Sequence, residues 1–365
     1  MQDKTKNVGL VLQGGGALGA YEAGAIKRIF EMGFRPEILT GTSIGALNAA
    51  VLAAPTYGEA HETLQDMWSY LGHEHPFPLF QQYNTAYTSL GHPRFFKLHG
   101  SMFGMSRRPS IYDISPALET MKRFIDFDRL NAPETPTVVV TATNVVSGEI
   151  ERFSNRTHTL RPEHIMASGA LPPSFPPIEI DGEHYWDGGL YDNTPIQSLI
   201  RILDEHEIAH LPIFVIELFG ALGDVPKDLH QSIDRMTELV YEDKFWKTFE
   251  GHDEAYAFAE MLWELEQDLP AESSVRQKAA FDKLMRLRAI SHIFTIPAER
   301  AALRNVIDFS PSTIQKRFES GYKAADYALE KNAFRINYIV HNRTQSERVD
   351  APDLGQSHSR RGTAA

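Results

Sequence analysis

The pattern of hydrophobic and polar positions changes its period repeatedly in the first 220 residues. Short apolar, β-branched runs, typical of buried strands, alternate with segments whose apolar residues recur at three- and four-residue spacing, typical of helices. This alternation predicts a mostly parallel sheet covered by helices. The clearest strands are expected at Val8–Gln13, Glu37–Gly41, Thr137–Thr143 and Ile213–Leu218.

Helical spacing dominates from residue 221 to residue 290. A strand at His292–Pro297 and an amphipathic helix at Ser312–Asn332 follow, and they indicate that the main sheet resumes after a helical insertion. The helices of the insertion are predicted at Ser232–Phe249, Glu254–Gln267 and Val275–Ala289.

The chain therefore divides into four parts. We expect a core over residues 1–220, the helical insertion over 221–290, a strand and helix that complete the core over 291–342, and a disordered polar tail over 343–365. The aromatic stretch Gly72–Pro109 has poor periodicity and is expected to form loops or a cap, within which Pro76–Met105 either forms an apolar contact surface or packs on the core.

Composition and charge exclude several classes of function. The formal net charge is -12 and no Lys/Arg block stands out, so a nucleic-acid partner held through phosphates is not expected. There are no cysteines, which excludes disulfides, thiolate metal sites and a cysteine nucleophile. No apolar stretch reaches the roughly 18 residues of a membrane helix, and the short apolar run near residue 8 does not have the pattern of a signal peptide, so none is expected here. A cytoplasmic protein is expected, with peripheral contact to membranes left open.

A glycine-rich turn follows the first predicted strand. Residues 14–19 read Gly-Gly-Gly-Ala-Leu-Gly and lead directly into a helical pattern. Such a turn exposes backbone N–H groups at a helix N-terminus, where they bind negative charge. The spacing fits a dinucleotide fingerprint, an oxyanion hole or a purely structural turn. The dinucleotide interpretation requires an acidic residue at the end of the next strand, where this chain instead has a second sharp turn.

The second turn carries the candidate nucleophile. Residues 41–45 read Gly-Thr-Ser-Ile-Gly and match G-x-S-x-G between a short strand and the helical pattern Ala46–Ala54. This strand–turn–helix context makes Ser43 a candidate nucleophile. A serine needs a base, and none of the 15 histidines has a setting typical of a catalytic triad. His292 comes nearest, but it begins a predicted strand and is interpreted as structural.

A third block completes a family pattern. Residues 165–177 read Ile-Met-Ala-Ser-Gly-Ala-Leu-Pro-Pro-Ser-Phe-Pro-Pro, and a short apolar strand then leads into Asp187-Gly188-Gly189. Together with the glycine loop and the serine turn, these blocks resemble patatin-like phospholipases over about residues 8–200. One departure is that Leu18 and Gly19 follow the glycines, where many members of the family place an arginine.

The resemblance implies a three-layer α/β/α fold and a serine hydrolase of fatty acyl esters in lipids, with no cofactor and no metal. Ser43 is the implied nucleophile and Asp187 its only base, a Ser–Asp dyad without histidine. The implied oxyanion hole consists of the N–H groups of Gly14, Gly15, Gly16 and Ala17. The implied supports of the two turns are Gly41, Gly45, Gly188 and Gly189. The exact lipid substrate and the oligomeric state do not follow from the resemblance.

Two other functions compete with this one. His206, Glu207 and His210 fit H-E-x-x-H, the helix motif of zinc hydrolases, but a proline and a buried-type strand follow at once and leave little room for a cleft. A catalytically inactive lipid-binding module is the second alternative. It predicts the loss of the serine, the aspartate or a loop glycine, all of which are present.

Overall fold

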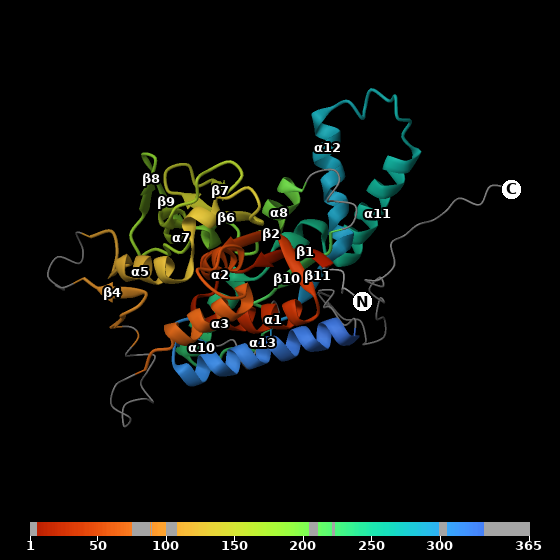
Figure 1. The fold of residues 1–365 in the computed structure, drawn as a ribbon. Coiled ribbons are helices and arrows are strands. Elements are labelled where there is room, and N and C mark those ends of the chain that lie inside the picture. Colours follow the sequence, from red (N-terminus) through yellow and green to blue (C-terminus); the bar gives the residue numbers. More distant parts are fainter. Residues whose placement is uncertain are drawn as a thin grey trace.

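The computed structural model describes residues 6–74, 88, 90–99, 108–203, 211–220, 223–298 and 305–331. Within these residues eight strands form one mixed sheet, in the order β11-β10-β1-β2-β6-β9-β8, with β7 also paired to β6 (Figure 1). The strands are β1 (Lys6–Leu12), β2 (Phe34–Thr42), β6 (Thr137–Asn144), β7 (Ile150–Ser154), β8 (Ile178–Ile180), β9 (Glu183–Asp187), β10 (Ile213–Ile216) and β11 (Ile293–Ile296).

The sheet is parallel on one side and antiparallel on the other. Strands β11, β10, β1, β2 and β6 pair in parallel, so their carboxyl ends meet at one edge. Strands β7 and β9 each pair antiparallel with β6, and β8 pairs antiparallel with β9. The four predicted strands are confirmed within one or two residues at each end, except that β2 begins three residues earlier. The antiparallel hairpin β8–β9 was not predicted.

Helices cover both faces of the sheet and give the expected three-layer α/β/α fold. Alternate residues of β1 show the division: Leu10 and Leu12 belong to the core under helices α1, α2, α3 and α13, whereas Val11 belongs to the core under α8 and α11. The first group of helices is α1 (Gly19–Glu31), α2 (Ile44–Ala53), α3 (Ala60–Leu71), α5 (Ser115–Phe124) and α13 (Pro311–Lys331). The second group is α8 (Ile196–Ile202), α11 (His252–Asp268) and the 3-10 helices η5 (Phe245–Phe249) and η6 (Arg286–His292).

Smaller elements connect these layers. They are η1 (Gly16–Leu18), α6 (Phe127–Leu130), α7 (Pro162–Ser168), η4 (Gly188–Leu190) and a small sheet of β3 (Gly91–His92), β4 (Phe96–Leu98) and β5 (Tyr112–Asp113). The described part of the predicted cap packs on the core: Phe96 is buried against Tyr112 and Phe175, and Phe95 packs against Phe309. The rest of the cap lies outside the described residues.

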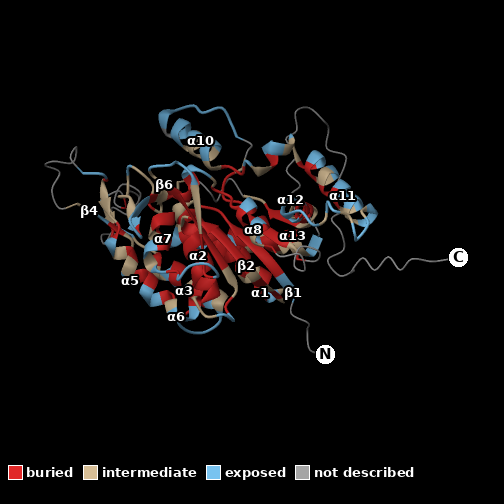
Figure 2. Ribbon diagram, turned by 90° about the horizontal axis from the view of Figure 1, so that it is seen from above, coloured by how far each residue is buried: buried red, intermediate tan, exposed pale blue. Residues whose placement is uncertain are grey.

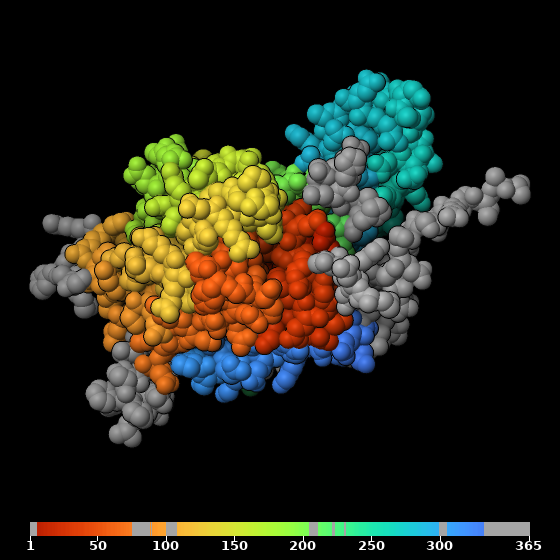
Figure 3. Space-filling model, in the orientation of Figure 1, coloured from red at the N-terminus to blue at the C-terminus, as the bar shows by residue number. Residues whose placement is uncertain are grey.

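The helical region after residue 220 consists of two separate parts. Helices α11 and α12 (Ala279–Met285) stand out from the body (Figure 3), whereas α10 (Leu229–Tyr241) lies apart from them (Figure 2). The prediction of one helix over Ser232–Phe249 was wrong. Helix α10 ends at Tyr241, and a separate 3-10 helix, η5, begins at Phe245, whose amide donates a hydrogen bond to the Asp243 side chain at 2.9 Å.

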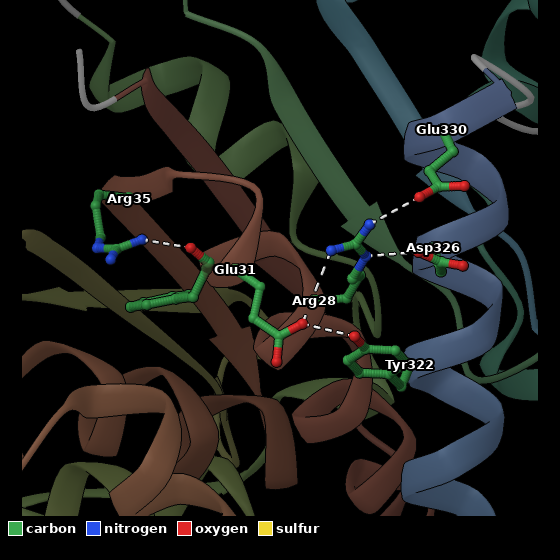
Figure 4. A network of polar contacts seen from close by, with 7 residues as sticks. Arg28, Glu31, Arg35, Tyr322, Asp326 and Glu330 are labelled. Atoms are coloured by element: carbon green, nitrogen blue, oxygen red, sulfur yellow. Dashed lines mark hydrogen bonds and ion pairs between the residues drawn. The ribbon is translucent and has the colours of Figure 1, made fainter. Parts of the chain in front are cut away.

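The last helix, α13, packs closely against α1 although it lies almost 300 residues later in the chain (Figure 1). Gly24 and Gly321 make this possible, because a Cβ on either would overlap a backbone carbonyl oxygen of the other helix. At the rim, Arg28 contacts Asp326 at 2.6 Å and Glu330 at 3.1 Å (Figure 4). The Tyr322 hydroxyl donates to Glu31 at 2.6 Å. No helix among the described residues is long and apolar enough to cross a bilayer.

The close approach of the two helices predicts that Gly321→Ala destabilises the fold. Alanine favours a helix over glycine by about 1 kcal/mol, but the added methyl group meets the Tyr21 carbonyl rather than a movable side chain. We expect a net loss of roughly 2 kcal/mol in the free energy of unfolding, measured by urea denaturation. Lys316→Ala, at an exposed position of the same helix, should change it by less than about 0.5 kcal/mol. A more stable Gly321→Ala protein would contradict the packing argument.

Candidate active site

Ser43 lies at the tip of the turn between β2 and α2. Its backbone has φ 55° and ψ -120°, a strained conformation for a residue with a side chain. Gly41 and Gly45 allow the bend, because a Cβ on Gly41 would overlap the Gly45 carbonyl and one on Gly45 would overlap the Leu12 carbonyl. The predicted turn and its glycine supports are therefore present, with the serine hydroxyl at the carboxyl edge of the parallel strands.

Asp187 reaches the same edge from the antiparallel part of the sheet. It is the last residue of β9 and pairs with Ala142 of β6, which is the neighbour of β2. Its backbone amide donates to the Ala170 carbonyl at 3.1 Å, and its own carbonyl accepts from the Thr143 hydroxyl at 3.0 Å. These bonds fix the backbone on both sides of the carboxylate. Gly188 is required here, since a Cβ would lie 2.6 Å from the Thr141 carbonyl oxygen.

The structure brings Ser43 and Asp187 together. The Asp187 carboxyl is buried, accepts a hydrogen bond from the Gly189 amide at 2.7 Å and lies next to the Ser43 side chain. Burial raises the pKa of Asp187 to about 7, although the interactions with Gly189 and Ser43 oppose the rise. A carboxyl group with this pKa loses its proton near neutral pH and can take one up from a hydroxyl during a reaction.

Two residues that the sequence analysis did not single out hold the site in place. The Ser168 hydroxyl, at the end of α7, accepts a hydrogen bond from the Ser43 amide at 2.8 Å. The Asn193 side-chain amide donates to the Gly14 carbonyl at 3.1 Å and to the Tyr241 carbonyl at 2.9 Å. Ser168 lies within the Ala-Ser-Gly-Ala segment of the proline-rich block, so the sequence carried a local signal for it. No local sequence pattern marked Asn193.

The glycine loop packs directly against the candidate nucleophile. A Cβ on Gly14 would lie 3.0 Å from Ser43 Cβ. The Gly14 amide makes a long bond of 3.4 Å to the Asn193 carbonyl, and the Ala17 amide donates to the Val306 carbonyl at 2.8 Å. Among the described residues, the amides of Gly15 and Gly16 donate to no protein acceptor. These two amides are therefore free to bind an oxygen of a ligand.

A buried arginine supports the glycine loop from behind. Arg317 of α13 donates to the carbonyls of Ala17 at 3.1 Å, Asp308 at 2.8 Å and Asn305 at 2.7 Å. Burial lowers the pKa of Arg317 to about 10, so the guanidinium stays charged at neutral pH. Charged donors make stronger hydrogen bonds than neutral ones, and here they tie the loop at residues 305–308 to the glycine loop.

Acidic groups surround the far side of the site. Burial raises the pKa of Asp192 to about 6 and that of Asp243 well above its usual range, and the negative charge of Glu217 adds to the rise at Asp243. Burial, followed by the charge of Asp187, raises the pKa of Tyr241 to about 12. Burial therefore favours the uncharged forms of these groups, and the region becomes unfavourable for further negative charge as the pH rises.

No histidine of the described residues is hydrogen-bonded to Ser43 or Asp187. His292 ends η6 and its ring packs against Trp263, so β11 begins one residue later than predicted. His206, Glu207 and His210 of the competing zinc motif lie outside the described residues, as does the predicted tail over 343–365. Within the described part of the chain no cluster of His, Asp or Glu has the arrangement of a metal site.

Comparison with known proteins identifies a family that this chain matches. A family model described as patatin-like phospholipase matches residues 10–200, which include the glycine loop, Ser43 and Asp187. Lysophospholipase nte1 of Aspergillus terreus is 30% identical over 202 residues, which are 53% of this chain and 11% of the relative. Lysophospholipase NTE1 of Coccidioides immitis is 28% identical over 244 residues, which are 64% of this chain and 13% of the relative. The chain thus spans only a small part of the length of these relatives.

Among solved structures, VipD from Legionella pneumophila aligns with 90% of this chain and 67% of its own chain, at 18% sequence identity and a TM-score of 0.40.

The raised pKa of Asp187 predicts a pH-dependent difference in stability between the natural chain and Asp187→Asn. The folded carboxyl holds its proton up to about pH 7, whereas the unfolded one loses it near pH 4, so the folded state binds more protons between these values. The stability that this group contributes is present below about pH 4 and falls by roughly 3–4 kcal/mol as the pH rises to 7.

Urea denaturation at several pH values measures this difference. The amide of Asp187→Asn has nearly the same shape and does not titrate, so the variant should gain stability relative to the natural chain between about pH 4 and pH 7. Other buried carboxyls titrate in both proteins and cancel in the comparison. A difference that stays constant with pH would show that Asp187 titrates normally in the folded state.

Proposed function

Because this chain belongs to the patatin-like phospholipase family, we propose that it hydrolyses fatty acyl esters of lipids through a dyad of Ser43 and Asp187. The observation that carries the proposal is the position of the Ser43 side chain, on a strained strand–helix turn, next to a buried carboxyl whose pKa is about 7. This is the pairing of nucleophile and base that acyl transfer requires.

In the proposed first step, Ser43 Oγ attacks the carbonyl carbon of the ester and its proton moves to Asp187. The tetrahedral intermediate then collapses, the bond to the leaving alcohol breaks, and Asp187 returns the proton to that alcohol. Water attacks the resulting acyl-enzyme in the same manner and releases the fatty acid. One carboxyl group therefore serves as base and then as acid in each half of the reaction.

The oxyanion of each tetrahedral intermediate is assigned to the glycine loop. The free amides of Gly15 and Gly16 are the donors that support this assignment best, with Gly14 beside them. Ala17 was part of the same expectation, but its amide already donates to Val306. In the proposal Ala17 therefore anchors the loop, and each remaining donor contributes roughly 3 kcal/mol of stabilisation to the transition state.

Phospholipids and lysophospholipids are the proposed substrate class. The family description and the names of the two fungal relatives support it, since both are called lysophospholipases. A binding module without catalysis is less well supported, because every group that the reaction needs is present. A metal-dependent reaction has no support from the described residues, where the serine and the carboxyl already supply nucleophile and base.

The first test of this function is covalent labelling. A fluorophosphonate should label the natural chain at Ser43, because it traps an activated serine as a stable adduct. Ser43→Ala should lose both the labelling and at least roughly 10⁴-fold in turnover of a short-chain p-nitrophenyl ester and of lysophosphatidylcholine. Ser147→Ala, at an exposed serine on the surface, is the matched control and should retain both. Labelling that persists in Ser43→Ala would refute the assignment of the nucleophile.

The second test concerns the base. Since Asp187 must be ionised to accept a proton, kcat/KM should rise with pH and level off above about pH 7. Asp187→Asn should lower activity by roughly 10²- to 10⁴-fold and remove this inflection.

A histidine base would give an inflection at a similar pH, but temperature separates the two. Carboxyl groups ionise with little enthalpy, so the inflection of a dyad should hardly move between cold and warm assays, whereas that of an imidazole shifts clearly. A single His→Ala variant that folds normally yet is as inactive as Ser43→Ala would contradict the dyad.

A further inference from the structure

Helix α10 exposes its apolar side to solvent. Four residues at spacings of four, three and four lie on one face of the helix, and all are between 45% and 77% exposed. These residues, here named the α10 stripe, are Leu229, Ile233, Met236 and Val240. Figure 2 shows that α10 has none of the buried residues that mark the inner faces of the other long helices.

The polar side of the same helix faces the protein. Asp234, Arg235 and Glu238 are half-buried, and Arg235 pairs with Glu238 at 2.8 Å. The Arg235 guanidinium packs against the backbone of Gly223, since a Cβ there would overlap it. A surface helix of a globular protein normally has the opposite orientation, with its apolar stripe toward the core. The exposed stripe therefore calls for an apolar environment outside this chain.

The stripe ends at the candidate active site. The carbonyl of Tyr241, the residue after Val240, accepts a hydrogen bond from Asn193, which also holds the glycine loop. In the loop after Asp187, Leu190 and Tyr191 are 45% and 54% exposed and add apolar surface, and the neighbouring Gly189 packs against the Tyr241 ring at the end of α10. A lipid surface in contact with the stripe would thus lie next to Ser43 and Asp187.

The charge of α10 indicates which kind of lipid surface fits. The helix carries two carboxylates and one arginine, and the stripe itself carries no charge. Helices that bind anionic membranes by attraction are rich in Lys and Arg on their polar face, which α10 is not. A chain with a net charge of -12 is also repelled by an anionic surface. Binding must therefore come from apolar insertion, which a zwitterionic surface allows.

We propose that the α10 stripe inserts into the headgroup–acyl boundary of a zwitterionic phospholipid surface and holds the catalytic edge of the sheet against it. This inference rests on the proposed lipid hydrolysis, because it names the physical form in which the substrate is met. It predicts that docking depends on the stripe and is insensitive to salt, whereas the chemistry depends on the dyad.

Co-sedimentation with phosphatidylcholine vesicles tests the proposal without turnover. The full chain carries Ser43→Ala in every sample, so that the vesicles stay intact. Adding Ile233→Ser and Met236→Ser should weaken partitioning at least roughly tenfold, at low and at high salt alike. The matched control carries Met261→Ser and Leu265→Ser, two exposed apolar positions on α11, and should partition within about twofold of the parent.

A second variant keeps the test decisive if the double variant does not fold. In Ile233→Trp, the emission of the new indole should shift to the blue on vesicles and be quenched by lipids brominated near the headgroup. The inference is overturned if the parent does not bind phosphatidylcholine, if the stripe variant binds as well as the control, or if binding needs anionic lipid and disappears in salt.

A self-association experiment tests whether a second copy of the chain, rather than a lipid surface, covers the stripe. If sedimentation equilibrium shows a dimer that the stripe variant dissociates, a second copy of the chain covers the stripe and the proposal fails. None of these measurements depends on hydrolysis, so they can fail while Ser43 remains catalytic. Conversely, activity that survives Ser43→Ala would refute the dyad and leave the vesicle result standing.

Discussion

The structure of the site depends on how closely three backbone segments of the chain approach one another at the edge of the sheet. The carbonyls at the end of β1, the turn at Ser43 and the start of α2 meet where Gly45 leaves no room for a Cβ. With a side chain at that position, α2 could not begin so close to the first strand. Ser43 would then lose its strained, projecting conformation and its contact with the glycine loop. The lack of space for a side chain at Gly45 thus fixes the position of Ser43, on which the proposed reaction depends.

Burial of the Asp187 carboxyl links stability to the proposed reaction. The environment that raises its pKa to about 7 makes the ionised form unfavourable in the folded state. The same environment increases the basicity of the carboxylate toward the Ser43 proton. The hydrogen bond from Gly189 and the nearby Ser43 side chain offset the effect of burial only in part, so the carboxyl can gain and lose its proton near neutral pH. A fully solvated aspartate would be stable but a poor base at neutral pH.

Local patterns in the sequence predicted the parallel strands and the turns at the glycine loop and at Ser43, because apolar runs favour buried strands and glycines permit sharp turns. They indicated one short strand before Asp187 and not the hairpin β8–β9, whose strands are short and partly polar. Nor did they identify Asn193 or Arg317, which act on carbonyls distant in sequence. For α10 the periodicity correctly indicated a helix. The side it turns toward the protein could not be predicted, because orientation depends on contacts such as that of Arg235 with Gly223.

Arg317 has a consequence for the order in which the molecule is assembled. The serine and the aspartate both lie in the first 200 residues, but the arginine that braces the glycine loop lies in the last helix, some 300 residues after Ala17. During synthesis from the N-terminus, Ser43 and Asp187, the proposed nucleophile and base, are made long before the helix that braces the glycine loop. The proposed oxyanion site is braced only when that final helix docks. In the proposed reaction, chain topology thus delays hydrolysis of lipid until the fold is complete.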